Sequence, residues 1–263
     1  IGFSDYIIRM ALPQDVFFRH FFGPEGNRPE YSVIAMDGDQ PVGLNLGGIK
    51  VYEGVKTLRC GGLCVHPDYR GGGISRKLFE LHRDIALEHQ CQQLFLEVIV
   101  GNDRAISFYK KMGYEKVYDL AYYSHSRPSD IRTSLPGDVV VDRIDLNVLR
   151  SLGDRVRDIH INWQNDFDYI SHFADQAHYG AFQDGQLIGA LSIHPKGKIS
   201  FIWTDPGHRL KGIGKGLIHR AVEELQPQKL SICFPNHASL LGFLKRLNFA
   251  RDAISQYEMY ITL

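Results

Sequence analysis

Cysteine is scarce in this chain, and its four cysteines are scattered. No Cys-x-x-Cys pair occurs, and the twelve histidines show no His-x-x-x-His spacing beside them. The usual zinc-binding patterns are therefore missing, and we expect no bound metal. Scattered free thiols are typical of a reducing compartment, so the sequence indicates a cytoplasmic protein without disulfides.

Long apolar runs and an excess of one charge are also missing. No stretch of 18 apolar residues occurs, so we expect no membrane-spanning helix. The 30 basic and 30 acidic side chains cancel, which gives no reason to expect nucleic acid or an anionic membrane surface as a partner. A chain of 263 residues with 44% hydrophobic residues predicts a globular protein with one large domain or two ordinary ones.

Two common nucleotide-binding patterns are absent as well. There is no Gly-x4-Gly-Lys-Ser/Thr run, and Arg76 stands where the pattern Gly-x-Gly-x-x-Gly would need its last glycine. What is present is a strand over 63–65, a turn, and a glycine-rich start of a helix whose apolar residues recur at helical spacing over 74–85.

Such a turn is suited to binding a diphosphate. The first N–H groups of a helix have no internal partner, and the helix dipole favours an anion there. Glycine also lets a ligand approach the backbone closely. We therefore interpret this segment as a pyrophosphate cradle. The predicted residues are Leu63, Cys64, Val65, Arg70, Gly71, Gly72, Gly73, Ile74 and Ser75.

A second pattern follows about thirty residues later, which fits one helix and one strand. An apolar strand over 94–100 leads to Asn102 at the start of a predicted helix. Tyr109 lies seven residues further on (109 − 102 = 7), and Gly113 stands at the helix end, where a left-handed residue usually caps.

Together the two patterns resemble a known pair of motifs. Arg70-x-x-Gly73-x-Ser75 resembles the acetyl-CoA pyrophosphate loop of the GNAT acyltransferase superfamily. The pattern Asn-x-x-Ala-x-x-x-Tyr-x-x-x-Gly-Tyr from Asn102 to Tyr114 resembles its second CoA-binding motif. The resemblance implies an α/β fold, a mixed and mostly antiparallel sheet flanked by helices, with acetyl-CoA as cosubstrate.

The resemblance also implies roles for the predicted residues. Backbone N–H groups of Cys64 and Val65 would bind the thioester carbonyl and the pantetheine. Those of 71–75 would bind the pyrophosphate, with Arg70 beside them, and Asn102 would hold the cofactor arm.

Acyl transfer to an amine requires a base, a site for the oxyanion and protonation of the leaving thiolate. The run Leu-Glu-Val followed by the second motif resembles the ribosomal-protein alanine acetyltransferases, in which a glutamate is the base and a tyrosine the acid. This implies Glu97 as base and Tyr109 as acid, with His66, Glu53 and Asp103 as alternative bases.

Several local features bear on the shape of the site. Gly61–Gly62 interrupts a strand, and we expect either a bulge that opens a slot for the pantetheine or a simple kink. The loop over 23–29 either borders the acceptor pocket or is plain surface. We also expect a strand over 6–10 and short strands on either side of Asp119.

The chain then repeats itself. Ala35–Gly43 has a counterpart in Ala181–Gly189, and Val65–Ser75 has one in Thr204–Gly214, with the arginines 139 residues apart (209 − 70). Such repetition predicts two copies of a domain, each long enough for its own core. We expect a catalytic domain over 1–127, a linker over 128–138 and a second, degenerate domain over 139–263 that begins with helix over 146–164.

The second copy keeps the cradle residues Arg209, Gly212 and Gly214 but not the catalytic pair. Depending on the alignment, the tyrosine position holds Phe243 or Leu244, and neither carries a hydroxyl. The position of the base holds Ser231 or Ile232, and neither is acidic. We therefore expect the second copy to shape the protein or its substrate site rather than catalyse.

The sequence thus predicts an acetyl-CoA-dependent N-acetyltransferase that acts on a primary amine of a small molecule or peptide, with its active site in the N-terminal copy. One alternative is a non-catalytic acyl-CoA-binding regulator. Another is acyl transfer to a protein N-terminus or lysine. The acceptor, the acyl chain length and the oligomeric state stay open at this point.

Overall fold

The structure is a computed structural model that describes residues 12–133, 135–156 and 159–263. It divides into two compact units, Ile1–Asp119 with Ser255–Leu263, and Leu120–Ile254. The last nine residues therefore belong to the second repeat by sequence but to the first unit by contacts. The strand expected over 6–10 lies outside the described residues.

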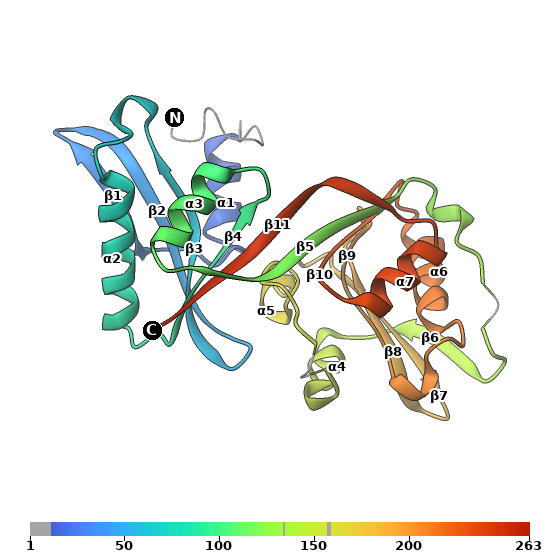
Figure 1. Cartoon of the computed structure of the whole chain (residues 1–263). Helices are drawn as coiled ribbons and strands as arrows, with labels where there is room; N and C mark the ends of the chain where they lie inside the picture. The colour runs from blue at the N-terminus through green and yellow to red at the C-terminus, as the bar shows by residue number, and fades with distance from the viewer. Residues whose placement is uncertain (1–11, 134, 157–158) are drawn as a thin grey trace. The chain divides into compact units, whose positions relative to one another are not determined.

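The first unit is a mixed, mostly antiparallel sheet with the order β1-β2-β3-β4-β11 (Figure 1). The hairpins β1–β2 and β2–β3 are antiparallel, β3–β4 is parallel, and β4–β11 is antiparallel. Its elements are α1 (Gln14–Phe21), β1 (Arg28–Asp37), β2 (Gln40–Tyr52), β3 (Val55–Val65), η1 (Pro67–Tyr69), α2 (Ile74–Glu88), β4 (Gln93–Ile99) and α3 (Asp103–Lys111), with parts of β5 (Glu115–His125) and β11 (Ala250–Thr262).

Alternation along β3 and β4 separates the two faces of this sheet. Leu58 and Cys60 on β3, with Leu96 on β4, pack into a core with buried residues of α2 and α3. Arg59 lies between Leu58 and Cys60, and Glu97 follows Leu96, so both side chains point to the opposite face of the sheet. That face carries the candidate catalytic groups.

β5 and β11 each run from one unit into the other. Leu120–His125 of β5 pairs with β10 in the second unit, and Gln256–Thr262 of β11 pairs with β4 in the first. The prediction of separate short strands around Asp119 is wrong, because β5 is continuous through this residue. Asp119 binds Lys116 at 2.8 Å, and no glycine or proline interrupts the strand.

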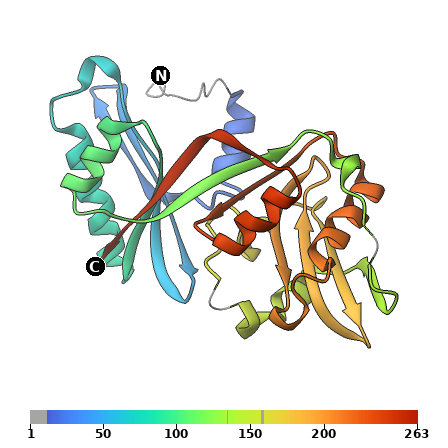
Figure 2. The same cartoon turned by 45° about the vertical axis from the view of Figure 1, so that its right-hand side comes forward.

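The second unit repeats the same layering, with the order β5-β10-β9-β8-β7-β6. Helices α6 and α7 pack on one face of its sheet, and α4 and α5 pack on the other. Figure 2 shows the orange and red helices in front of the orange strands. Its elements are β6 (Val139–Arg143), α4 (Leu146–Arg150), η3 (Gly153–Val156), α5 (Phe167–Ile170), β7 (Ala177–Gln183), β8 (Gln186–Ile193), β9 (Lys198–Thr204), η4 (Pro206–His208), α6 (Ile213–Leu225), β10 (Leu230–Pro235) and α7 (Ala238–Arg246).

The helix predicted over 146–164 is much shorter than expected. Only α4 and the 3-10 turn η3 form within the described part of this range. Gly153 has a positive φ of 38°, a conformation that an α-helix does not allow, so the helix ends before it.

Candidate active site

A pocket of about 270 Å³ lies at the predicted cradle in the first unit. Residues that line it include six of the predicted cofactor-binding positions, together with side chains of α3. The lining residues are Val65, Tyr69, Arg70, Gly71, Gly73, Ile74, Ser75, Arg76, Phe108 and Met112. Leu63, Cys64, Gly72 and Asn102 are not among them.

The backbone of the cradle has the conformation that its glycines allow. Gly71 and Gly73 both have φ of 83°, in the left-handed region that side chains rarely adopt. Gly73 is the N-cap of α2, and among the described residues no side chain caps this helix start. The first N–H groups of α2 are thus available to an anion. Arg70 closes the turn, because its Nε donates to the Val65 carbonyl at 3.1 Å.

β3 and β4 separate next to the pocket. Their ladder ends, within the described strands, at the pair Cys60–Leu96. Gly61 is an extra residue against β2, where the register shifts between Leu46 and Gly47. Of the two expected alternatives, a bulge or a simple kink, the bulge is present. Beyond it β3 and β4 no longer pair, which leaves a slot between them. Leu63, Cys64 and Val65 lie along this slot, as expected for groups that bind a pantetheine arm.

Tyr109 reaches the start of the slot from the helix side. Its ring is buried in the core beside Tyr114, with ring centroids 5.6 Å apart. Burial raises the pKa of the Cys60 thiol to about 11, although a hydrogen bond with Tyr109 lowers it. Since Cys60 is the last β3 residue that pairs with β4, the Tyr109 hydroxyl lies where the strands separate.

Glu97 lies at the same point on the opposite face of the sheet. It is the first β4 residue beyond the last pair, and its Oε2 accepts from Arg59 Nη2 at 2.6 Å. Arg59 Nη1 donates to Glu25 Oε2, also at 2.6 Å. All three side chains are buried, with 3–6% of their surface exposed. The slot therefore has a phenol at one face and a carboxylate–guanidinium–carboxylate chain at the other.

Burial raises the pKa of Glu97 to about 7 against the opposing effect of Arg59, and Glu258 and Glu25 raise it further. Its second oxygen, Oε1, is buried and has no hydrogen-bond partner among the described residues. A carboxylate with a free oxygen and a pKa near neutrality is suited to general base catalysis.

The alternative bases are less suited. The Nδ1 atom of His66 accepts from the Asp68 N–H and so caps the turn η1. Glu53 and Asp103 are exposed. Asn102 caps α3, where its Oδ1 accepts from Ala105 N at 3.3 Å.

Arg59 and the partner role of Glu25 do not follow from the sequence motifs, although a local signal exists for each. Arg59 is a charged residue within an otherwise mostly apolar, glycine-interrupted strand, and Glu25 belongs to the loop over 23–29, one possible border of the acceptor pocket. This loop supplies a buried carboxylate, so it is more than plain surface.

The second unit keeps the backbone of the cradle. Gly212 is the N-cap of α6 with φ of 85°, and Leu210 has φ of 63° at the position that corresponds to Gly71 (71 + 139 = 210). Arg209 Nε donates to the Thr204 carbonyl at 3.3 Å, as Arg70 does to Val65.

The candidate acid and base, Tyr109 and Glu97, have no counterparts among the described residues there. His237 caps α7 as Asn102 caps α3. Lys198 stands at the position that corresponds to Arg59 (59 + 139 = 198). Its Nζ donates to the backbone carbonyl of Gln164 at 3.1 Å, and Arg59 Nη1 likewise donates to the backbone carbonyl of Glu25. Ile232 packs in the core with α6 and α7, on the helix-covered face of its own sheet. In the first unit Glu97 lies on the other face, so Ile232 does not take its place.

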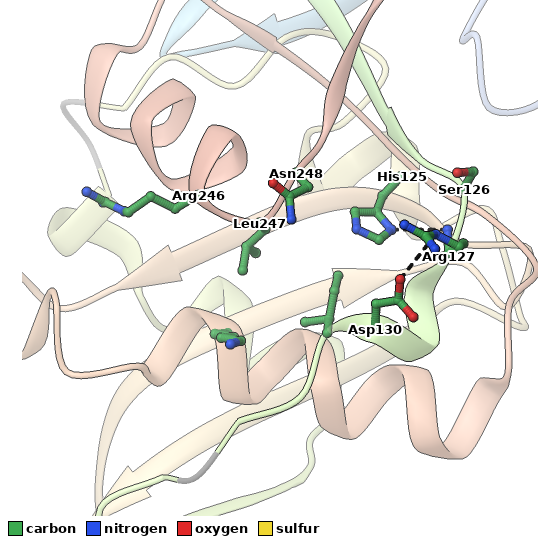
Figure 3. Close-up of a pocket in the computed structure, with 9 residues that line it drawn as sticks. His125, Ser126, Arg127, Asp130, Arg246, Leu247 and Asn248 are labelled. Atoms are coloured by element: carbon green, nitrogen blue, oxygen red, sulfur yellow. Dashed lines mark hydrogen bonds and ion pairs between the residues drawn. The ribbon is translucent and has the colours of Figure 1, made fainter.

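The second unit has a cavity of about 160 Å³ whose lining does not include Arg209, Gly212 or Gly214 of the cradle at the head of α6. Asp130 and Ile131 of the predicted linker line this cavity, and Arg127, just before the linker, binds Asp130 at 3.1 Å. Figure 3 shows Arg246 at the end of α7 and, after the helix, Leu247 and Asn248 on another wall. The linker therefore packs on the second unit.

The described residues give no support to a metal site or to a membrane-spanning helix. Within the ranges given above, no three His, Cys, Asp or Glu side chains are grouped so that they could hold a metal ion. None of the described helices has the length and apolar character needed to cross a bilayer.

The two-copy fold and the glycine-rich cradle at the head of α2 are typical of acyltransferases that take their acyl group from a CoA thioester. A family model described as "Acetyltransferase (GNAT) family" matches residues 5–114 and 150–249. The chain belongs to this family in both of its repeats.

Curated relatives match part of the chain. The protein named N-alpha-acetyltransferase 30 of Schizosaccharomyces pombe is 35% identical over 95 residues, which are 34% of this chain and 63% of that protein. The Saccharomyces cerevisiae protein of the same name is 30% identical over 133 residues, 48% of this chain and 74% of that protein. The match to the S. pombe protein thus spans less than two thirds of its length.

Solved structures share the fold of the whole chain. A tandem GNAT protein from the clavulanic acid biosynthesis pathway has a TM-score of 0.63 at 16% identity, over 89% of this chain and 84% of that one. A putative acetyltransferase from Pyrococcus horikoshii has a TM-score of 0.63 at 17% identity, over 97% and 81%. These similarities establish the two-copy architecture.

Proposed function

We propose that this protein transfers an acetyl group from acetyl-CoA to a primary amine, and that the reaction takes place in the first unit. The observation that carries the proposal is the placement of Tyr109 and Glu97 at the same end of the slot, one at each face of the sheet. The pocket at the head of α2 lies along the same slot and supports binding of the CoA diphosphate there.

The chain's own groups account for each step. An alkylammonium has a pKa of about 10.4, so the acceptor must lose a proton before it attacks. Glu97 takes this proton, directly or through water. The backbone N–H of Val65 points away from β2, because His66 and Cys64 are the residues whose N–H groups pair with that strand. The Val65 N–H holds the thioester oxygen as charge develops on it. Tyr109 donates its proton to the departing thiolate. Acetyl-CoA supplies the acetyl group as a thioester.

Among amines, the relatives named N-alpha-acetyltransferase favour the α-amine of a peptide over a small amine. The free cysteines Cys60, Cys64, Cys91 and Cys233 support a cytoplasmic location. The second copy keeps its cradle backbone, but Phe243 ring atoms lie 3.2–3.3 Å from where a Cβ at Gly214 would stand. We therefore propose one functional cofactor site per chain.

The test combines calorimetry with turnover. Titration with acetyl-CoA should give one equivalent bound per chain, and release of free CoA should require peptides or small amines with a free amino group. Glu97→Gln should lower kcat by roughly 10²–10⁴ with cofactor binding retained, because it removes the base. The matched control is Glu53→Gln, which changes an exposed glutamate and should leave the rate unchanged.

Two results would contradict the proposal. Tight binding of acetyl-CoA without transfer to any amine would favour the acyl-CoA-binding regulator. Full activity of Glu97→Gln would remove Glu97 from the mechanism.

A further inference from the structure

Glu258 lies directly opposite Glu97 in the sheet. The two residues are register partners in the antiparallel pair β11–β4. Side chains of directly opposed residues project from the same face, with Cβ atoms about 4.5–5.5 Å apart. Glu258 is fully buried, at 0% exposure. Like charges in this arrangement destabilise a sheet.

Charges of both signs act on Glu97. Arg59 contacts Glu25 and Glu97 at 2.6 Å each, and the buried Glu258 acts on Glu97 from the neighbouring strand. The titratable or charged groups that face Glu97 come from four further elements. They are Arg59 on β3, Glu25 before β1, Tyr52 on β2, and Glu258 and Tyr260 on β11.

We infer that Glu258 is a positioning residue of the acetyl-transfer site, because it sets a second negative charge against Glu97 and so keeps Glu97 basic despite its ion pair with Arg59. The inference rests on the proposed function of Glu97. It also assigns a role to the second repeat, whose last strand carries Glu258 into the first unit.

Glu25 provides an internal comparison. It binds the same guanidinium at the same distance as Glu97 and is similarly buried. Burial opposes ionisation of Glu25, but Arg59 and His20 outweigh it and lower its pKa to about 2. Burial raises the pKa of Glu97 to about 7 in spite of Arg59, and Glu258 contributes to that rise. The two carboxyls therefore differ in their other neighbours: Glu25 has a histidine and Glu97 has a carboxylate.

The consequence concerns the strength of the base. A carboxylate with a low pKa is a poor proton acceptor, and general base catalysis is most effective when the pKa lies near the working pH. Burial would still raise the pKa of Glu97 without Glu258, but the largest charge effect that opposes Arg59 would be gone, so Glu97 would be a weaker base. The rate would then depend less steeply on pH near neutrality.

The experiment compares three variants of the full chain. Glu258→Gln removes the charge and keeps the shape, Glu258→Asp keeps the charge, and Glu115→Gln removes an exposed charge at the start of β5 in the same unit. One readout is the acid limb of kcat/KM against pH with one acceptor throughout, so that the titration of the acceptor cancels. The other is the ¹³C NMR titration of the Glu97 carboxyl, which requires no activity.

We expect Glu258→Gln to shift both the acid limb and the Glu97 titration to lower pH, while Glu258→Asp and Glu115→Gln stay close to the wild type. An unshifted Glu97 titration in Glu258→Gln overturns the inference, and so does an equal shift in Glu115→Gln. If Glu258→Gln does not fold, the ¹³C NMR titration of Glu97 and Glu258 in the wild-type protein tests the inference instead. Coupled, two-step curves for Glu97 and Glu258 support the inference, and independent curves overturn it.

The two proposals can fail separately. If Glu97→Gln keeps full activity, the proposed base is wrong, yet the NMR titration still reports whether Glu258 controls Glu97. If Glu97→Gln is inactive and Glu258→Gln titrates like the wild type, only the role of Glu258 is lost.

Discussion

Leu244 occupies in the second unit the position that Tyr109 occupies in the first. Each lies six residues after the first residue of its helix, α7 or α3 (244 − 238 = 6; 109 − 103 = 6), and each is buried. The sequence allowed either Phe243 or Leu244 at this position. The helix N-caps select Leu244, because it follows His237 by seven residues, as Tyr109 follows Asn102 (244 − 237 = 7; 109 − 102 = 7). A leucine has no proton to donate, so the second helix cannot protonate a leaving thiolate.

The first prediction concerns the Tyr109 hydroxyl. Tyr109→Phe should lower kcat by roughly 10²–10⁴ because the general acid is lost. The matched control is Tyr114→Phe, which removes a neighbouring hydroxyl that is buried without a hydrogen-bond partner among the described residues. The control should retain activity and gain about 1 kcal/mol in free energy of unfolding. Steady-state kinetics and urea unfolding of both variants measure this; an unchanged kcat in Tyr109→Phe would exclude it as the acid.

The second prediction concerns the two conformations within the glycine run. Gly73→Ala should cost about 1–2 kcal/mol in free energy of unfolding, because φ of 83° is unfavourable for any residue with a Cβ. It should also weaken acetyl-CoA binding, since Gly73 lines the pocket. Gly72→Ala is the control: its φ is not positive, the nearest atom to an added Cβ is Tyr69 O at 3.8 Å, and its stability should stay within about 0.5 kcal/mol of wild type. Urea unfolding of the two variants measures the difference. Equal losses of unfolding free energy in Gly73→Ala and Gly72→Ala would show that the positive φ of Gly73 is not the cause.

The third prediction is a stabilising substitution in the second unit. Leu210 has φ of 63° and is 89% exposed, so it bears the strain of a left-handed conformation with little gain from burial. Leu210→Gly should therefore raise the free energy of unfolding by roughly 0.5–1 kcal/mol, the relief of strain less the entropy of an unfolded glycine. The adjacent Lys211→Gly, at an ordinary φ, should not stabilise. Denaturant unfolding of the two variants decides, and a loss of stability in Leu210→Gly would contradict the prediction.

The fourth prediction links Glu25 to stability and pH. Its pKa falls from 4.5 to about 2 on folding, because Arg59 and His20 outweigh the effect of burial. Its stabilising contribution is therefore complete above about pH 4.5 and is lost as the pH falls towards 2. Glu25→Gln should cost roughly 3–5 kcal/mol at pH 7, since it breaks a buried ion pair. Urea unfolding at pH 7, 5 and 3 should show this difference shrinking at pH 3; a constant difference would count against the assigned pKa.

Local pattern was enough to predict the fold and most of the cradle. The glycines, the helix start and the two motif spacings depend on residues close in sequence, so their conformations follow from neighbours along the chain. The bulge at Gly61 and the repeat of Arg70 by Arg209 were predictable for the same reason. The extent of β5 and of α4 was not, because the strand is held by pairing with β10, and α4 ends at Arg150, ahead of Gly153 with its positive φ.

By itself, the sequence determined the family, the duplication and the identity of Glu97 and Tyr109 as candidates. Only the tertiary structure decided what surrounds Glu97. Its partners Arg59 and Glu258 lie 38 and 161 residues away in sequence (97 − 59; 258 − 97), and no local pattern connects them. The chemistry of a buried carboxyl depends on the charges that folding places around it, and those distances exist only once the sheet has formed.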